Sequence, residues 1–267
     1  TVVVNEVPAV QNPSAAGVFG TATDGSPLSM ANTTVVIEEN GPARAVVRAD
    51  GSLHDNADQR VIDFTLRMTA RAGSSDVEVT MTLRNADLTY PAHVQLGSVE
   101  LGTELALSQL APGVAPTATM PLHGAGKPSL SRVLNLGTDE MTLYMGQTSA
   151  KVSTYSNNFF PHIPKQAGSA SELVDQGYEV VADGAVQHAL GDKNQYPKVG
   201  FATLSNGVAG VTVHQRQMPY LWPAGLEVRG DGQVTAGVFT KQNDAGYTFL
   251  WQQHESRTVV FSFHTGA

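Results

Sequence analysis

Apolar and polar residues alternate along much of this chain, most regularly between residues 43 and 84. Three segments have a period of two: residues 43–50, 63–69 and 76–84. This alternation predicts β-strands with one face on a core and the other in water. Polar turns separate the segments, and residues 55–60 are expected to form an exposed loop tip. The pattern therefore predicts an antiparallel sheet in this part of the chain.

Runs of β-branched and alternating residues predict further strands. They lie at residues 33–38, 141–145, 199–204, 209–214, 226–228, 233–239 and 257–264, and a strand pair is expected within residues 94–106. Residues 108–128 are rich in Pro, Gly and Ala, which predicts a long loop. No stretch of three or more helical turns shows a 3.6-residue period. We therefore expect an all-β fold: an antiparallel β-sandwich, or a large supersandwich, with long irregular loops.

Composition narrows the class of protein. All 267 residues are expected to form one domain, with residues 1–34 as an N-terminal extension or edge strand. The chain has no cysteine, which excludes disulfides and thiolate metal sites. A net charge of −8 without any run of Lys and Arg argues against nucleic-acid binding, and no apolar run approaches the roughly 20 residues of a membrane helix. Because the chain begins at Thr1 without a leader, we expect a matured product or an excised piece of a longer protein.

No sequence motif requires a cofactor or a metal ion. Asp55 and Asp58 could hold calcium in principle, but the spacing is common in solvated turns, and we interpret it as such a turn. Two clusters combine aromatic residues with His and Arg: residues 214–229 (HQRQMPYLWPAGLEVR), continued by 251–257 (WQQHESR), and residues 155–165 (YSNNFFPHIPK). Flat aromatic faces can contact sugar rings, and Arg can hold a carboxylate with two hydrogen bonds. The alternative interpretation is structural, with the aromatic side chains closing one end of the sandwich.

The segments EENGPARAVVRADG (38–51) and DFTLRMTARAGSSDVEVTMTLRN (63–85) resemble the central β region of the exo-rhamnogalacturonan lyase and YetA-like family. Downstream, QMPYLWPAGLEV (217–228) and SRTVVFSFH (256–264) are similar to later motifs of that family. The resemblance, over about residues 35–267, implies a secreted or cell-envelope β-sandwich with an acidic polysaccharide or oligosaccharide as ligand. Val259-Val260 replace the family's His-Glu, and its C-terminal α/α toroid has no counterpart here. Both a binding module and a polysaccharide lyase therefore stay open.

For a lyase, the resemblance implies β-elimination, in which a base removes the proton α to a uronate carboxylate and a cation stabilises the enolate. Arg216 is the expected carboxylate ligand, with His214 or Tyr220 as acid or base. His214 and Arg216 are two residues apart on a predicted strand and should share a face. The expected substrate-binding residues are Trp222, Arg229, Trp251, His254, Arg257, Tyr155 and His162.

Two other classes of protein are compatible with the sequence. A structural subunit of an extracellular filament, fibre or surface layer could use the same sandwich and self-associate through an edge strand such as residues 1–7. A sugar isomerase or epimerase would need a His and a Glu in one pocket. Glu227 and Glu255 are the candidates, because they lie beside Arg229 and His254 in the sequence.

Overall fold

A computed structural model describes residues 3–4, 7–8, 17–85, 93–106, 112–122, 129–136, 139–154, 172–190, 200–218, 223–241, 247–250 and 254–265. Most of these residues lie in β-strands, and no α-helix occurs in these ranges. The predicted all-β class is confirmed. No helix in the described ranges is both long and apolar enough to span a membrane.

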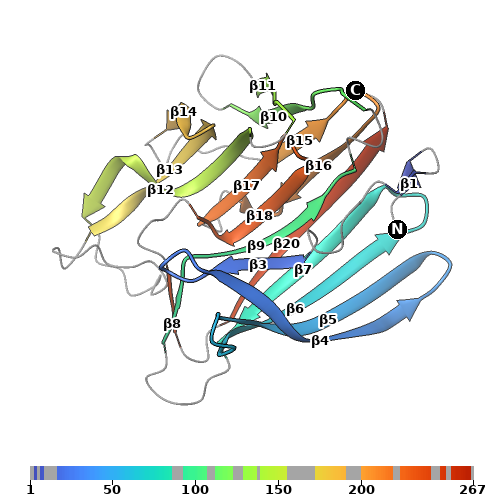
Figure 1. The fold of residues 1–267 in the computed structure, drawn as a ribbon, viewed down its shortest axis with the longest axis horizontal. Coiled ribbons are helices and arrows are strands. Elements are labelled where there is room, and N and C mark those ends of the chain that lie inside the picture. The colour runs from blue at the N-terminus through green and yellow to red at the C-terminus, as the bar shows by residue number, and fades with distance from the viewer. Residues whose placement is uncertain are drawn as a thin grey trace.

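The strands form two packed sheets (Figure 1). The two sheets are connected edge to edge, so that their sixteen strands have one continuous antiparallel order. The first sheet has the order β11 (Ser129–Val133), β10 (Thr117–Pro121), β15 (Phe201–Ser205), β16 (Ala209–Gln215), β20 (His254–Thr265), β7 (Asp76–Arg84), β6 (Arg60–Arg71), β5 (Arg44–His54) and β4 (Pro27–Asn40). The second sheet continues with β3 (Gly17–Thr21), β9 (Ser98–Glu104), β18 (Gln233–Phe239), β17 (Ala224–Arg229), β12 (Glu140–Thr154), β13 (Glu172–Ala182) and β14 (Ala185–Leu190).

Strand β4 joins the two sheets. Its first residues, Pro27 and Leu28, pair with β3, whereas residues 29–40 pair with β5. Two short strand pairs lie outside the large sheet: β1 (Val3–Val4) with β2 (Val7–Pro8), and β8 (His93–Leu96) with β19 (Tyr247–Leu250). Within residues 1–34, the predicted extension or edge strand, β3 lies between β4 and β9, whereas residues 29–34 of β4 pair with β5 alone among the described strands.

The core lies between the inner faces of the two sheets. In β20, Val259, Phe261 and Phe263 are buried, while the residues between them are partly exposed. Leu83 of β7 and Leu226 of β17 are fully buried from opposite sheets. Burial of one such side chain contributes about 1.5–3 kcal/mol. The period of two that predicts the strands is thus the alternation between core and solvent.

The three most regular predicted segments are β5, β6 and β7, which pair in chain order as a meander. Two other details differ from the prediction. The strands within residues 94–106 do not pair with each other, because β8 pairs with β19 and β9 lies between β3 and β18. Residues 108–128 contain a strand, β10, which pairs with β11 and β15. Short strands of this kind lack enough alternation to be distinguished from a loop in sequence.

Candidate functional site

His214 and Arg216 lie on the outer face of the first sheet, at the end of β16 and in the turn that follows it. His214 pairs with Val260 of β20 and is partly buried. The exposed Arg216 forms an ion pair with Glu78 of β7, at 2.7 Å between Nη2 and Oε2. Burial lowers the pKa of His214, and the charge of Arg216 lowers it further. The two side chains are therefore close enough to interact, as their spacing predicts.

Replacing Arg216 by Gln is expected to raise the pKa of His214. The substitution removes a positive charge that disfavours the protonated imidazole, while the effect of burial stays in place. An NMR titration of the histidine ring protons measures this pKa. Arg132→Gln is a matched control, because Arg132 forms its ion pair with Asp183 instead. An unchanged His214 pKa in Arg216→Gln would contradict the electrostatic coupling.

His254 and Arg257 lie on opposite faces of β20. His254 is exposed on the outer face, opposite Arg84 of β7, whereas Arg257 faces inward and is 3% exposed. The odd spacing of three residues explains the difference, because side chains alternate along a strand. Glu255 also faces inward, and its Oε1 forms an ion pair with Nη2 of Arg257 at 2.8 Å. His254 and Glu255, a pairing considered for an isomerase, therefore point away from each other.

Arg257 and Gln215 introduce polar groups into the apolar inner face of the first sheet. Gln215 pairs with Val259, two residues after Arg257, so both side chains lie on the same face of neighbouring strands. Burial lowers the pKa of Arg257, and the Glu255 carboxylate opposes this effect. Within the described part of the chain, neither amide atom of Gln215 has a hydrogen-bond partner, and neither do Nε and Nη1 of Arg257. Each unpaired buried group costs about 1–3 kcal/mol of stability.

Arg229 is remote from these residues in the sheet order. It ends β17 of the second sheet and pairs with Asp231, at 3.3 Å between Nε and Oδ2. The two aspartates considered for calcium are used inside their own loop: Asp55 accepts the N–H groups of Ala57 and Gln59, and Asp58 pairs with His54. The other predicted site residues lie outside the described residues: Tyr155, His162, Tyr220, Trp222 and Trp251.

A charged cluster on the outer face of the second sheet contains Glu227, which the sequence offered only as an isomerase candidate, together with residues that were not predicted. Glu227 of β17 is buried, and its Oε2 lies 2.7 Å from Nζ of Lys241. The same Nζ lies 3.4 Å from Oε2 of Glu140. Glu100 of β9 and Glu227 both line a cavity of about 10 Å³, which is roughly the space that one water molecule needs.

The two carboxyl groups in this cavity have raised pKa values. Burial raises the pKa of Glu100 to about 7, and the charge of Glu227 adds to the increase. Burial also raises the pKa of Glu227, whereas Lys241 acts in the opposite direction. The residue before this lysine, Thr240, is held by Tyr247, whose hydroxyl donates to the Thr240 carbonyl oxygen at 3.0 Å. In sequence, Glu100 occupies an ordinary polar position of a strand, and no local signal shows that it lies beside Glu227.

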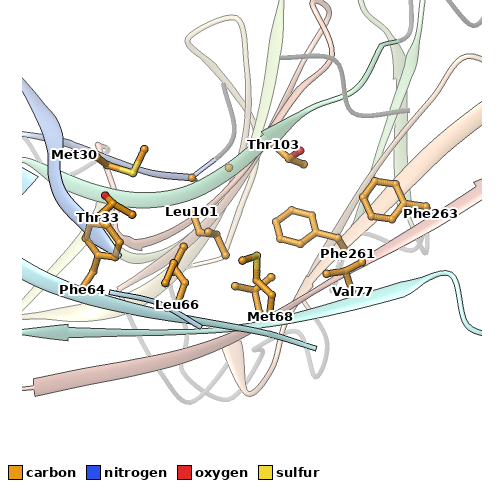
Figure 2. A pocket seen from close by; sticks show the side chains of 14 residues that line it. Met30, Thr33, Phe64, Leu66, Met68, Val77, Leu101, Thr103, Phe261 and Phe263 are labelled. Carbon is orange, nitrogen blue, oxygen red and sulfur yellow. The ribbon is translucent and has the colours of Figure 1, made fainter. Parts of the chain in front are cut away.

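An apolar cleft of about 440 Å³ opens between the two sheets (Figure 2). Phe64, Leu66 and Phe261 form part of its wall on the first sheet, and Leu101 faces them from β9. The volume is typical of small-molecule sites. However, the lining is almost entirely apolar and lacks the planar polar groups that sugar hydroxyls require, so this cleft does not match the predicted ligand class.

Comparison with known proteins supports the resemblance over part of the chain. Residues 21–93 match the family model of the PcRGLX-like protein central beta sandwich domain. This segment extends from the end of β3 to the start of β8 and includes the most regular predicted strands. Residues 21–93 are therefore similar to this central β-sandwich domain. Among curated proteins, no sequence matches the chain.

Solved structures with a similar arrangement include an α-galactosidase from Lactobacillus brevis, with a TM-score of 0.44 and 10% identity, covering 96% of this chain and 30% of that one. The GH36 α-galactosidase AgaA from Geobacillus stearothermophilus has a TM-score of 0.37 and 13% identity, over 100% and 32% of the two chains. The Slr1438 protein from Synechocystis sp. PCC 6803 has a TM-score of 0.39 and 10% identity, over 90% and 66%. The chain thus spans about a third of the length of these two α-galactosidases.

Proposed function

We propose that this chain is a carbohydrate-active β-sandwich module that binds an acidic polysaccharide or oligosaccharide where β16 meets β20. The observation that carries the proposal is the pair of unsatisfied side chains, Arg257 and Gln215, whose unpaired atoms are closed to solvent, so that ligand binding has to expose them. Nε and Nη1 of Arg257 point to different sides of the guanidinium group, so each can donate to a separate oxygen of an acidic ligand. An amide both donates and accepts, which suits a sugar hydroxyl. The resemblance to rhamnogalacturonan lyases, supported over residues 21–93, points to the same class of ligand.

Binding is favoured over cleavage by the placement of the predicted catalytic residues. His214 and Arg216 lie on the outer face of the first sheet, whereas Arg257 lies on the inner face. A sugar whose carboxylate is held by Arg257 is therefore separated from His214 by the sheet itself. The outer face offers Arg216, but its charge is already balanced by Glu78. A secreted or cell-envelope location, where acidic polysaccharides are found, is part of the same proposal.

Replacing Arg257 by Met is expected to weaken binding of oligogalacturonates at least about tenfold, which corresponds to about 1.4 kcal/mol. Titration calorimetry with a series of purified oligogalacturonates measures the loss. Met fills similar apolar space and removes two buried donors that have no partner in the described structure, but it also removes the ion pair with the partly exposed Glu255. Thermal unfolding of the free protein checks that the variant is folded before its binding is compared.

Arg132→Met is the matched control, because Arg132 is a partly exposed arginine on β11 that also pairs with a carboxylate. We expect it to bind oligogalacturonates as the wild type does. A neutral galactose oligomer tests whether the carboxylate is required. Equal binding by the wild type and Arg257→Met, or no binding of any acidic glycan on an array, would overturn the proposal.

A further inference from the structure

Strand β4 has a free edge along most of its length. Residues 29–40 pair with β5 on one side, while β3 covers only Pro27 and Leu28 on the other (Figure 1). No other described strand pairs with this edge of residues 29–40. A free edge presents unpaired backbone N–H and C=O groups, to which another extended strand can bind.

The side chains along this edge are apolar to an unusual degree. Val35 is 63% exposed and Ile37 is 65% exposed, and both pair with inward-facing residues of β5. Met30, from the same strand, is 43% exposed and lines the apolar cleft shown in Figure 2. Isolated exposed apolar residues are common on soluble proteins, but a group on one face of an unpaired edge marks an interaction surface.

The other two edges of the sheet are short. β11 has five residues and β14 has six, and short edge strands discourage the addition of further strands. β4 has fourteen residues, but its register with β5 shifts between Ala31 and Thr34 and again between Ile37 and Glu39. The longest stretch of regular pairing is thus residues 34–37, and residues 29–31 form a shorter one. These irregularities limit strand addition at this edge to one short segment. They also disfavour the addition of many copies in succession.

We propose that a second copy of this chain pairs antiparallel with β4, about a two-fold axis at Val36. Antiparallel pairing places residues of the same face opposite each other. In this register, Val35 of each copy lies opposite Ile37 of the other copy. The pairing therefore covers both exposed apolar residues in each copy. Thr34 lies opposite the second copy's Glu38, and no carboxylate faces another one.

The charges along the edge are compatible with this pairing. The Glu38 carboxylate is held within its own chain by Arg67 at 2.7 Å and by Arg48 at 3.1 Å. Glu39 forms an ion pair with Arg44. Because these negative charges are balanced inside each copy, they do not repel the approaching strand.

The short regular segment limits the strength of the dimer. Stable protein interfaces bury at least about 1,000 Å², which four paired residues and two apolar contacts per copy do not reach. We therefore expect a dissociation constant of micromolar or weaker magnitude. The edge is four strands away from β20, about 19 Å across the sheet, so dimerisation is independent of the proposed glycan site.

Cross-linking through a single cysteine tests the register. The chain contains no cysteine, so Val36→Cys introduces the only thiol. Directly opposed residues of an antiparallel pair lie about 4.5–5.5 Å apart at Cα, within the range for a disulfide. Mild oxidation is expected to convert Val36→Cys into a covalent dimer, measured on non-reducing gels. Val186→Cys is the matched control, because Val186 is also exposed, at 52%, but lies on β14.

A second variant tests the apolar contact. Ile37→Lys in the Val36→Cys background should slow cross-linking at least about tenfold, because it places a charge opposite Val35. Its exposed position means that folding is retained, which circular dichroism checks. Cross-linking of Val36→Cys no faster than that of Val186→Cys would overturn the proposal. A wild-type protein that sediments as a monomer at about 1 mM would also overturn it. At that concentration, even a dimer with a binding free energy of about 4 kcal/mol is substantially populated.

Discussion

Lowering the pH from 8 to 5 is expected to stabilise the fold through Glu100, and Glu100→Gln should remove this gain. The folded-state pKa of Glu100 is raised to about 7, compared with 4.5 for the free side chain. A raised pKa means that the folded protein binds the proton more tightly than the unfolded chain. The resulting stability is fully present below pH 4.5 and is lost as the pH rises through 7. A difference of about 2.5 pKa units sets an upper value of about 3 kcal/mol.

Other groups contribute to the same pH range in different directions. Glu227 has a raised pKa and acts in the same sense as Glu100. His214 has a lowered pKa, so its contribution falls as the pH decreases through the value of the free side chain. The lowered pKa values of Glu38 and Asp50 affect stability only at more acidic pH. The comparison of the wild type with a single variant is therefore more informative than the wild-type profile alone.

Urea unfolding at several pH values between 5 and 8 measures the effect. Because Gln resembles a protonated Glu, Glu100→Gln should be more stable than the wild type at pH 8, by up to about 3 kcal/mol, and similar to it at pH 5. Glu39→Gln is the control, since Glu39 is partly exposed, pairs with Arg44, and has a lowered pKa. If both variants follow the wild-type pH profile, the carboxyl group of Glu100 is not buried as described.

Gly97→Ala is expected to destabilise the protein by about 3 kcal/mol, which lowers the melting temperature by roughly 6–12 °C for a chain of this size. A Cβ at this position would lie 2.3 Å from the carbonyl oxygen of Ala22 and 2.6 Å from Oγ1 of Thr21. The N–H of Gly97 also donates to the carbonyl oxygen of Thr21 at 2.7 Å. Backbone atoms held by such a bond cannot move aside as a flexible side chain can, so the clash must be relieved by separating strands.

Gly41→Ala is the matched control for this substitution. A Cβ at Gly41 would lie 3.4 Å from the carbonyl oxygen of Arg44, which is ordinary contact. We expect its stability to change by less than about 1 kcal/mol, because the loss of backbone freedom in the unfolded chain offsets small strain. Thermal and chemical unfolding of both variants provide the comparison. A Gly97→Ala protein as stable as Gly41→Ala would show that β3 and the start of β9 are not in close contact.

Some properties of the candidate site residues follow from their spacing in the sequence, and others do not. The even spacing of His214 and Arg216 correctly predicts a shared face, because side-chain direction along a strand depends only on spacing. The same rule places His254 and Arg257 on opposite faces, although both belong to one cluster of the sequence. The unpaired state of Gln215 and Arg257 could not be predicted, since it depends on which atoms of other strands surround them. The assignment of the predicted residues to a binding site stays a prediction.

By itself, the sequence determined that the chain is all-β, where its regular strands lie, and which side chains of β6, β7 and β20 face the core. These properties follow from the period of two, which is local. Only the tertiary structure decided that β4 joins two sheets, that β9 lies between β3 and β18, and that Glu100, Glu227 and Lys241 meet. The physical reason is that a strand's alternation specifies its two faces but not its neighbours. Pairing partners depend on packing and close approach between distant segments, as at Gly97.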